Sequence, residues 1–409
     1  KLSGYDFYRD VLGGPKYVIA PMVDQSELAW RTLGRRYGAH LAYTPMVNAK
    51  LFTSPSRRQS ALDKQFDLTH GEEGAPPDRP LIVQFCANDP QTLLAAAQLV
   101  EDRCDAVDIN LGCPQDIARR GHYGSFLQDE WELIHNLINI LHVNLKIPVT
   151  AKFRVFPSVE KTVEYARMLE RAGAQILTCH GRVREQRGQF SGLADWDKIR
   201  AVKDAVSVPV FANGNILYHS DIARCLEYTG ADAVMSAEGQ LYNAAIFAPA
   251  RPLPPLPPGQ GDDESLESAA ESMDNSYLSG MVSLDTGLQP RFCDLALEYL
   301  SIVRLQRTET EPSAVKGHIF KLLRPALARE PDLRDKLGRV TGTLFAPSRA
   351  RLPPDACAFA QFTAIVREMR RRMARDERTA ARVGAIGAIV DPATGTKTLP
   401  HWLAQAYVR

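Results

Sequence analysis

The chain has 409 residues, of which 45% are hydrophobic and 24% charged, and its formal net charge is +1. This length favours two domains, and no stretch is apolar over the length that a membrane span requires. The seven cysteines are an odd number without a CxxC pair, so neither a disulfide framework nor a zinc site is expected, and a reducing compartment is indicated.

The charge is unevenly distributed along the chain. Summed over Lys, Arg, Asp and Glu, residues 1–251 carry about −1, residues 252–290 about −7 and residues 291–409 about +9. A basic C-terminal third favours a polyanionic partner such as a nucleic acid, although a basic helical surface can also be simply solvated.

Eight short β-rich runs alternate with stretches of helical periodicity over the first 251 residues. The runs cover residues 17–21, 41–45, 81–85, 106–110, 149–155, 176–182, 208–214 and 233–237. Most are nearly continuous apolar runs, which is typical of parallel strands buried on both faces. They predict an α/β fold, a (β/α)₈ TIM barrel over residues 1–251. A doubly wound sheet is the alternative, but no GxGxxG follows the first strand.

The remaining residues differ in composition. Residues 252–290 are Pro-rich, then acidic and Ser-rich, which predicts a disordered linker or mobile insertion. Residues 291–385 have helical periodicity and predict a smaller all-α domain. The tail, residues 386–409, gives no clear signal.

Polar residues fall at the predicted C-terminal strand ends, where barrels carry their active sites. Lys152 in "TAKFRV" is costly inside a barrel unless paired with an anion, so it favours an anionic or electron-accepting ligand; Arg154 shares its face. His180 in "TCHGR" begins a polar motif that favours a polar ligand. The turns "FANGNI" and "MSAEG" follow the seventh and eighth strands, where barrels often bind phosphate. The charge of Glu238 would repel phosphate, so its backbone N–H is the expected contact.

A lone thiol follows the fourth strand in "DINLGCPQDIARRGHYGSFL". Cys113 lies between glycine and proline on a predicted loop, which makes burial in a core unexpected. It could serve as a nucleophile with a lowered pKa or as a general acid that stays protonated, and these roles are not separated by the residues alone. Glycines around His122 and Tyr123 indicate a loop that closes when the substrate arrives.

These motifs together resemble the flavin-dependent tRNA dihydrouridine synthases. The resemblance rests on "APMVDQSELAWR", the Cys113 loop, "AKFRV", "CHGRVREQ", "FANGNI" and "MSAEG". It covers residues 17–242 and extends more loosely to 325. The wording of the Cys113 loop is most similar to the eukaryotic class that acts on positions 16 and 17 of the tRNA D-loop.

The resemblance implies a reaction and a set of residues. NADPH would reduce FMN at the barrel mouth, the reduced flavin would pass hydride to C6 of an unstacked uridine, and Cys113 would protonate C5. The implied FMN-binding residues are Pro21, Met22, Val23, Gln84, Lys152, His180, Asn213, Gly214, Asn215, Ala237, Glu238 and Gly239. The implied substrate contacts are Asn110, Arg154 and Arg182 to the uridine, and Lys316, His318, Lys321 and Arg324 to the tRNA.

Two other functions are compatible with parts of the sequence. One is another FMN-dependent barrel oxidoreductase acting on a free small molecule, which would not need a basic helical domain. The other is a tRNA-binding protein without turnover, which would not need the Cys113 loop. We expect a monomer in the cytoplasm and/or the nucleus, with tRNA and NADPH as partners and without a metal or membrane.

Overall fold

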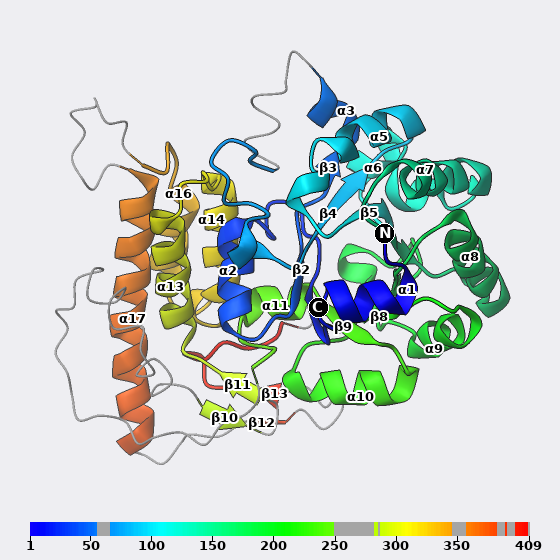
Figure 1. Cartoon of the computed structure of the whole chain (residues 1–409). Helices are drawn as coiled ribbons and strands as arrows, with labels where there is room; N and C mark the ends of the chain where they lie inside the picture. The colour runs from blue at the N-terminus through cyan, green and yellow to red at the C-terminus, as the bar shows by residue number, and fades with distance from the viewer. Residues whose placement is uncertain are drawn as a thin grey trace. The chain divides into compact units, whose positions relative to one another are not determined.

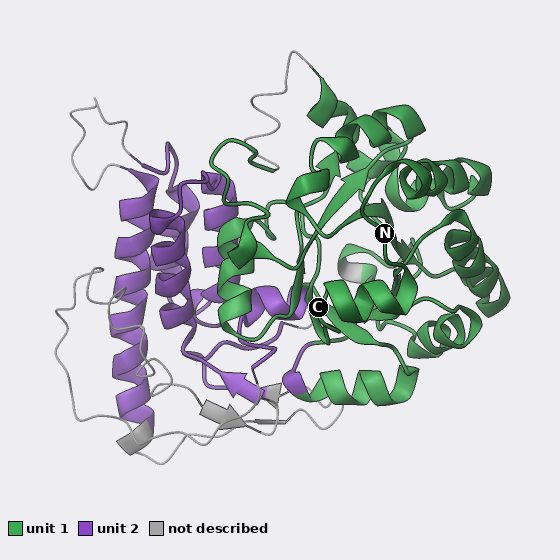
Figure 2. Cartoon of the chain, in the orientation of Figure 1, with its two compact units in different colours: residues 1–216, 220–237, 409 green, residues 217–219, 238–408 purple. Residues whose placement is uncertain are grey.

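The computed structural model describes residues 1–54, 66–248, 282–284, 287–345, 357–382, 389–390 and 397–407. Most of the predicted acidic linker, residues 252–281, therefore lies outside the described residues. The chain divides into two compact units (Figure 2). The first unit comprises residues 1–216 and 220–237, and the second comprises residues 217–219 and 238–408.

The first unit is a closed barrel of parallel strands, as predicted. Its strands are β1 (Tyr17–Ile19), β2 (Leu41–Tyr43), β4 (Leu81–Cys86), β5 (Ala106–Leu111), β6 (Val149–Arg154), β7 (Leu177–His180), β8 (Val210–Asn213) and β9 (Ala233–Ser236). Each pairs with its neighbours in chain order, β9 returns to β1, and β2 pairs with β4. A two-residue strand, β3 (Val47–Asn48), extends the sheet beside the end of β4. Nearly every strand residue is buried, because the strands are covered on both faces.

Helices surround the barrel (Figure 1). They are α2 (Leu28–Arg36), α3 (Ala49–Thr53), α5 (Pro90–Gln98), α7 (Trp131–Asn144), α8 (Val159–Ala172), α9 (Trp196–Ala205) and α10 (His219–Thr229), with a short α1 (Gly4–Asp6) before β1. Side-chain caps define several starts: Asp89, Ser158 and Asp195 accept hydrogen bonds from the backbone N–H three residues later. Gly173, at φ +117°, ends α8 in the left-handed conformation that favours glycine.

A buried ion pair lies within the barrel unit. Arg31 on α2 is fully buried, and its guanidinium lies 2.6 Å from the carboxylate of Asp78 and 3.1 Å from that of Glu73. It also donates to the carbonyl oxygen of Ser26. This pairing compensates the cost of burying three charges and holds residues 73–78 against α2.

The second unit contains the predicted helical region. Its helices are α11 (Glu238–Tyr242), α13 (Phe292–Leu305), α14 (Pro312–Leu322), α15 (Arg324–Leu327), α16 (Pro331–Arg339) and α17 (Ala358–Arg382). Helix α13 packs against α14 and α17, and α16 also packs against α17. No helix in the described part of the chain is both long and apolar enough to span a membrane.

Residues on both sides of the predicted helical domain pack with this unit. Strands β10 (Val282–Leu284) and β11 (Gly287–Gln289) form a hairpin, and residues 287–290 are buried although they fall within the predicted linker. In the tail, Leu403 is fully buried and forms a β-bridge with Arg291. The unit therefore begins before residue 291 and continues beyond 385, because backbone pairing holds segments without helical periodicity.

Candidate active site

Polar side chains gather at the C-terminal ends of four neighbouring barrel strands. The strand register pairs Asn110 on β5 with Lys152 on β6, Arg154 on β6 with His180 on β7, and His180 with Asn213 on β8. Adjacent strands in a sheet lie about 4.8 Å apart, so these residues share one rim of the barrel. This is the rim where (β/α)₈ barrels carry their chemistry.

Lys152 is a cation without a direct ion pair, although the negative charge of Asp108 partly offsets its own. Its side chain is largely buried, and it has neither a hydrogen bond nor an ion pair with any described residue. Burial, reinforced by the positive charge of Arg154, lowers the pKa of Lys152 to about 8. An unpaired buried ammonium is costly, so the site favours a ligand with negative charge or electron-accepting groups at this position.

His180 is held in one tautomer by its neighbour. The guanidinium of Arg182 donates to His180 Nε2 at 3.1 Å, and because a guanidinium has only donors, the ring proton lies on Nδ1. Burial and the positive charges of Lys152, Arg154 and Arg182 hold the pKa of His180 well below its usual value. The ring is therefore neutral at physiological pH and presents one N–H donor.

Arg154, predicted to face the substrate, braces two loops in this structure. Its Nε donates to the carbonyl oxygen of Gly112, and its Nη1 donates to the carbonyl oxygens of Val183 and Gln186, each at 2.9 Å. Arg182 similarly donates to the carbonyl oxygen of Gly192. Arg154 thus joins the loop after β5 to the loop after β7, and Arg182 joins the loop after β7 to the turn after β8 through Asn215, so both arginines fix the shape of the rim.

A buried network that the sequence did not single out runs up to the Cys113 loop. Asp108, in the middle of β5, accepts from Thr150 Oγ1 at 2.6 Å and from Gln84 Nε2 at 2.8 Å. Asn110 then donates to Gln84 Oε1, and its own Oδ1 accepts from the backbone N–H of Cys113. Burial raises the pKa of Asp108 to about 6. A carboxylate inside the apolar run "AVDIN" is the signal that could have pointed to this network, but the prediction did not draw on it.

The network changes the placement of two predicted ligand contacts. Gln84 is fully buried, and both the nitrogen and the oxygen of its side-chain amide form hydrogen bonds with protein groups. Contact with a cofactor would therefore require Gln84 to give up one of these partners. Asn110 contacts the Cys113 loop with its oxygen and Gln84 with its amide nitrogen. In this structure it positions the thiol.

The Cys113 backbone is held by hydrogen bonds, and the surroundings of its thiol favour the protonated form. The backbone N–H of Cys113 donates a hydrogen bond to the Asn110 side chain. The backbone N–H and the hydroxyl of Ser125 both donate to the Cys113 carbonyl oxygen. Its side chain packs beside Cys86 and Tyr123, and burial raises the pKa of the thiol despite the positive charges of Arg154 and Lys152. A half-buried thiol with a raised pKa is suited to donating a proton and poorly suited to nucleophilic attack.

The remaining predicted cofactor residues of the barrel unit lie after β1, β8 and β9. Pro21 and Met22 are partly buried and Val23 is 57% exposed, so this segment lines the rim. The Asn213 amide donates to the carbonyl oxygen of Met235 on β9, and Ala237 follows that strand.

The turn after β8 has little room for side chains. Gly214, at φ +116°, packs so closely that an added Cβ would lie 2.6 Å from Ala194 Cβ, and the Asn215 side chain bonds both to Ala194 and to Arg182. Glu238 and Gly239 begin α11 in the second unit, with Glu238 exposed and Gly239 buried.

The four basic residues predicted to contact tRNA do not share a surface. His318 is fully buried against the ring of Tyr299, so the structure contradicts its role as an RNA contact: α14 turns this side toward its own core. Lys316 donates to the carbonyl oxygens of Gly338 and Val340, where it caps the end of α16.

The other two basic residues also have contacts within the unit. The Lys321 ammonium lies 3.5 Å from the carbonyl oxygen of Gly317, and the Arg324 guanidinium lies 3.4 Å from the ring centroid of Tyr407. The exposed Arg324 remains accessible to a ligand.

Comparisons with known proteins point in one direction. A family model described as dihydrouridine synthase (Dus) matches residues 18–269. A tRNA-dihydrouridine(16/17) synthase of Saccharomyces cerevisiae is 51% identical over 340 residues, covering 82% of this chain and 72% of that protein. One of Schizosaccharomyces pombe is 42% identical over 416 residues, covering 100% of this chain and 91% of that protein. A relative of Mus musculus, named as tRNA-dihydrouridine(16/17) synthase-like, is 46% identical and covers 83% of this chain and 62% of its own length.

Proposed function

The chain belongs to the dihydrouridine synthase family, and from this premise we propose that it reduces the C5–C6 double bond of uridines 16 and 17 in the tRNA D-loop. NADPH is the proposed reductant and FMN the proposed bound flavin. The observation that carries the proposal is that one barrel rim holds a buried Lys152 cation without a direct ion pair together with a Cys113 thiol of raised pKa on a braced loop.

The residues of the rim fit a flavin. Lys152 is a buried cation with no hydrogen bond or direct ion pair among the described residues, and it lies near the end of β6, close enough to His180 on β7 for its charge to lower the pKa of that ring. When bound, a flavin reduced by NADPH supplies the hydride for the reaction. Lys152 would bind its electron-accepting ring and stabilise negative charge there, while Pro21, Met22 and Val23 lie on the same rim after β1.

The chain itself supplies the proton. Reduction of a C5–C6 double bond requires hydride at C6 and a proton at C5, and Cys113 is the proposed donor of that proton. Because burial raises the pKa of the thiol, it carries its proton at neutral pH, and water restores that proton after each turnover. Asn110 and Arg154 act on Cys113 by holding its loop through Cys113 N–H and the Gly112 carbonyl. His180 is the proposed neutral donor near the uridine.

The alternative functions lack the support that the relatives give. A barrel oxidoreductase acting on a free small molecule would not be expected to match tRNA-modifying relatives across its second unit, and one such relative aligns over the whole of this chain. A tRNA-binding protein without turnover would not need the Lys152 cation or the protonated thiol.

The direct test is product formation on unmodified tRNA transcripts. The purified protein with FMN and NADPH should form dihydrouridine, detected by mass spectrometry, and the product should disappear when positions 16 and 17 are replaced by cytidine. Reduction of free uridine at a comparable rate, or no dihydrouridine on any tRNA, would refute the proposal.

The thiol is tested with a matched pair of cysteine variants. Cys113→Ala should lower the rate of dihydrouridine formation by about 10²- to 10⁴-fold, the usual contribution of a general acid, while tRNA affinity is retained. Cys225→Ala removes a thiol from the barrel helix α10 and should leave the rate close to that of the wild type. Normal turnover by Cys113→Ala would exclude the thiol as proton donor.

A further inference from the structure

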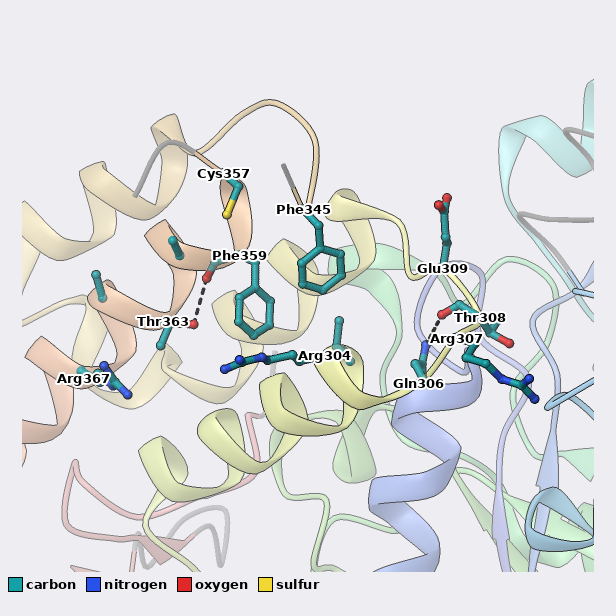
Figure 3. Close-up of a pocket in the computed structure, with 13 residues that line it drawn as sticks. Arg304, Gln306, Arg307, Thr308, Glu309, Phe345, Cys357, Phe359, Thr363 and Arg367 are labelled. Atoms are coloured by element: carbon teal, nitrogen blue, oxygen red, sulfur yellow. Dashed lines mark hydrogen bonds between the residues drawn. The ribbon is translucent and has the colours of Figure 1, made fainter. Parts of the chain in front are cut away.

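A cavity lies within the helical unit, apart from the residues assigned to the reaction. It has a volume of about 700 Å³ and is formed by the end of α13, the loop after it, Phe345 and the first turns of α17 (Figure 3). Small-molecule sites usually measure about 300–1,000 Å³, so a nucleotide would fit within this space.

The cavity exists because small side chains separate larger ones on α17. Phe359, Thr363 and Arg367 follow one another at intervals of four residues and share one face of the helix. Ala360 and Ala364 lie beside them and leave room above the helix. The Thr363 hydroxyl bonds back to the carbonyl oxygen of Phe359, which keeps it out of the space.

Two arginines of the cavity have no counterion. Arg304, in the last turn of α13, and Arg367 are both exposed, and neither has a hydrogen bond or ion pair with any residue that the structure describes. Figure 3 shows Arg304 running beneath the ring of Phe359 towards the side where Arg367 lies. The lining contains a third arginine, Arg307, and a single carboxylate, Glu309, which points away from the other two arginines in Figure 3.

Four other arginines of α17 differ from Arg367 in having carboxylate partners. The next four along the helix each have a carboxylate within 4 Å: Arg370 with Asp294, Arg371 with Glu368, Arg372 with Glu330, Asp332 and Glu368, and Arg375 with Asp376. Among the described residues, Arg304 and Arg367 are therefore available for an anion, as is the exposed Arg378 further along α17, whereas the four arginines between them and Arg378 are paired.

An aromatic surface adjoins these cations. The rings of Phe345 and Phe359 lie 5.1 Å apart between centroids at an interplanar angle of 34°. Phe359 is buried, whereas Phe345 is 44% exposed. Nucleic-acid bases stack on exposed aromatic rings of this kind, and the nearby guanidinium groups suit a phosphate.

We propose that this cavity binds one unpaired nucleotide of the tRNA other than the target uridine, with its phosphate on Arg304 and Arg367 and its base on Phe345. The inference rests on the proposed function for the identity of the RNA. A tRNA is favoured over a free nucleotide because the second unit carries the positive charge of the chain, about +9 over residues 291–409.

The test separates the two kinds of contact by their salt dependence. Affinity for an unmodified tRNA transcript is measured by fluorescence anisotropy over a range of salt concentrations. Arg304→Ala/Arg367→Ala should weaken binding and flatten the plot of log affinity against log salt by about 0.7, because the two arginines share one phosphate and each neutralised phosphate of a single strand contributes about 0.7 to the slope. Phe345→Ala should weaken binding about tenfold without changing this slope, and Phe345→Tyr should restore the affinity.

Matched controls distinguish this cavity from a general effect of charge. Arg329→Ala/Arg339→Ala removes the same two charges from exposed positions of the same unit and should have a smaller effect on affinity and slope. The KM for NADPH and the turnover rate at saturating tRNA should stay at wild-type values in all variants, and melting curves should show that each is folded.

Several outcomes would overturn the inference. Wild-type tRNA affinity in both cavity variants, or an equal loss in the control pair, would exclude a specific nucleotide site. A raised KM for NADPH with unchanged tRNA binding would assign the cavity to a free dinucleotide. If the wild-type protein forms dihydrouridine while the cavity variants bind tRNA normally, only this inference fails; a wild-type protein that neither binds nor modifies tRNA refutes the proposed function as well.

Discussion

Replacing Lys152 by methionine should stabilise the protein when no cofactor is bound, while reducing its ability to hold a flavin. Methionine has a similar length and no charge, so the substitution removes the uncompensated ammonium and fills the same space. The effect can be worked from the pKa. A lowering from 10.5 to about 8 corresponds to about 3 kcal/mol, at about 1.4 kcal/mol per pKa unit. This is the upper limit of the gain in the free energy of unfolding at pH 7.

The pH dependence of that gain has a definite sign. Below pH 8 the lysine is charged in both the folded and the unfolded protein, so the folded wild type bears the whole cost. Between about pH 8 and 10.5 the folded protein releases the proton before the unfolded chain does, and the cost declines. The stability difference between Lys152→Met and wild type should therefore be greatest at neutral pH and shrink as the pH rises through this interval.

The assay is urea unfolding of cofactor-free protein, followed by circular dichroism at several pH values. Lys50→Met removes an exposed lysine from α3 and should change stability by less than about 0.5 kcal/mol at any pH. In parallel, flavin retained on purification should fall in Lys152→Met and not in Lys50→Met. A less stable Lys152→Met protein at pH 7, or a stability difference independent of pH, would refute the interpretation of Lys152 as an uncompensated cation.

Two further predictions concern the packing of the Cys113 loop and the buried ion pair of Arg31. Gly124→Ala should reduce dihydrouridine formation at least tenfold, because the φ of Gly124 is +67° and the added Cβ would lie 2.8 Å from the carbonyl oxygen of Cys113. Gly188→Ala is the control, since Gly188 has a φ of +57° and nothing lies within 4 Å of the new atom. It should lose about 1 kcal/mol of stability without losing activity. Equal activity in both glycine variants would show that the crowding at Gly124 is unimportant. Arg31→Met should lower the free energy of unfolding by about 3–5 kcal/mol in urea titrations, since it leaves two buried carboxylates unpaired, and a change below about 1 kcal/mol would contradict this account of the ion pair.

The barrel could be predicted because its signal is local and repeated. Strands buried on both faces are apolar at nearly every position, and eight such runs with helices between them leave few alternatives. The second unit was harder to delimit. Residues 287–290 and Leu403 lack helical periodicity. Residues 287–289 pair with residues 282–284 in a hairpin, and Leu403 pairs with Arg291, which lies far from it along the chain.

The candidate site could be predicted in position more readily than in detail. Strand register places Asn110, Lys152 and His180 on one rim, and register follows from the barrel. Which atoms a polar side chain bonds to depends on rotamers and on loops from distant segments, so the sequence could not show that Arg154 holds the Gly112 carbonyl. Periodicity likewise gave the relative angles of residues on α14 but not which side of the helix packs inward. For this reason the prediction placed His318 on the RNA-binding surface, whereas the structure buries it.

The glycines of the Cys113 loop were singled out from the sequence, but the structure gives them a role other than the predicted one. The sequence suggested that they allow the loop to close on tRNA. In the structure, residue 124 must be glycine because it packs against the Cys113 backbone, which a side chain there would overlap. His122 takes a left-handed conformation at φ 51° that ends α6 (Asp116–Gly121). The same close packing buries the thiol beside Cys86 and Tyr123, and that burial raises its pKa. The glycine thus contributes to the chemistry indirectly, because close packing keeps Cys113 protonated before any substrate binds.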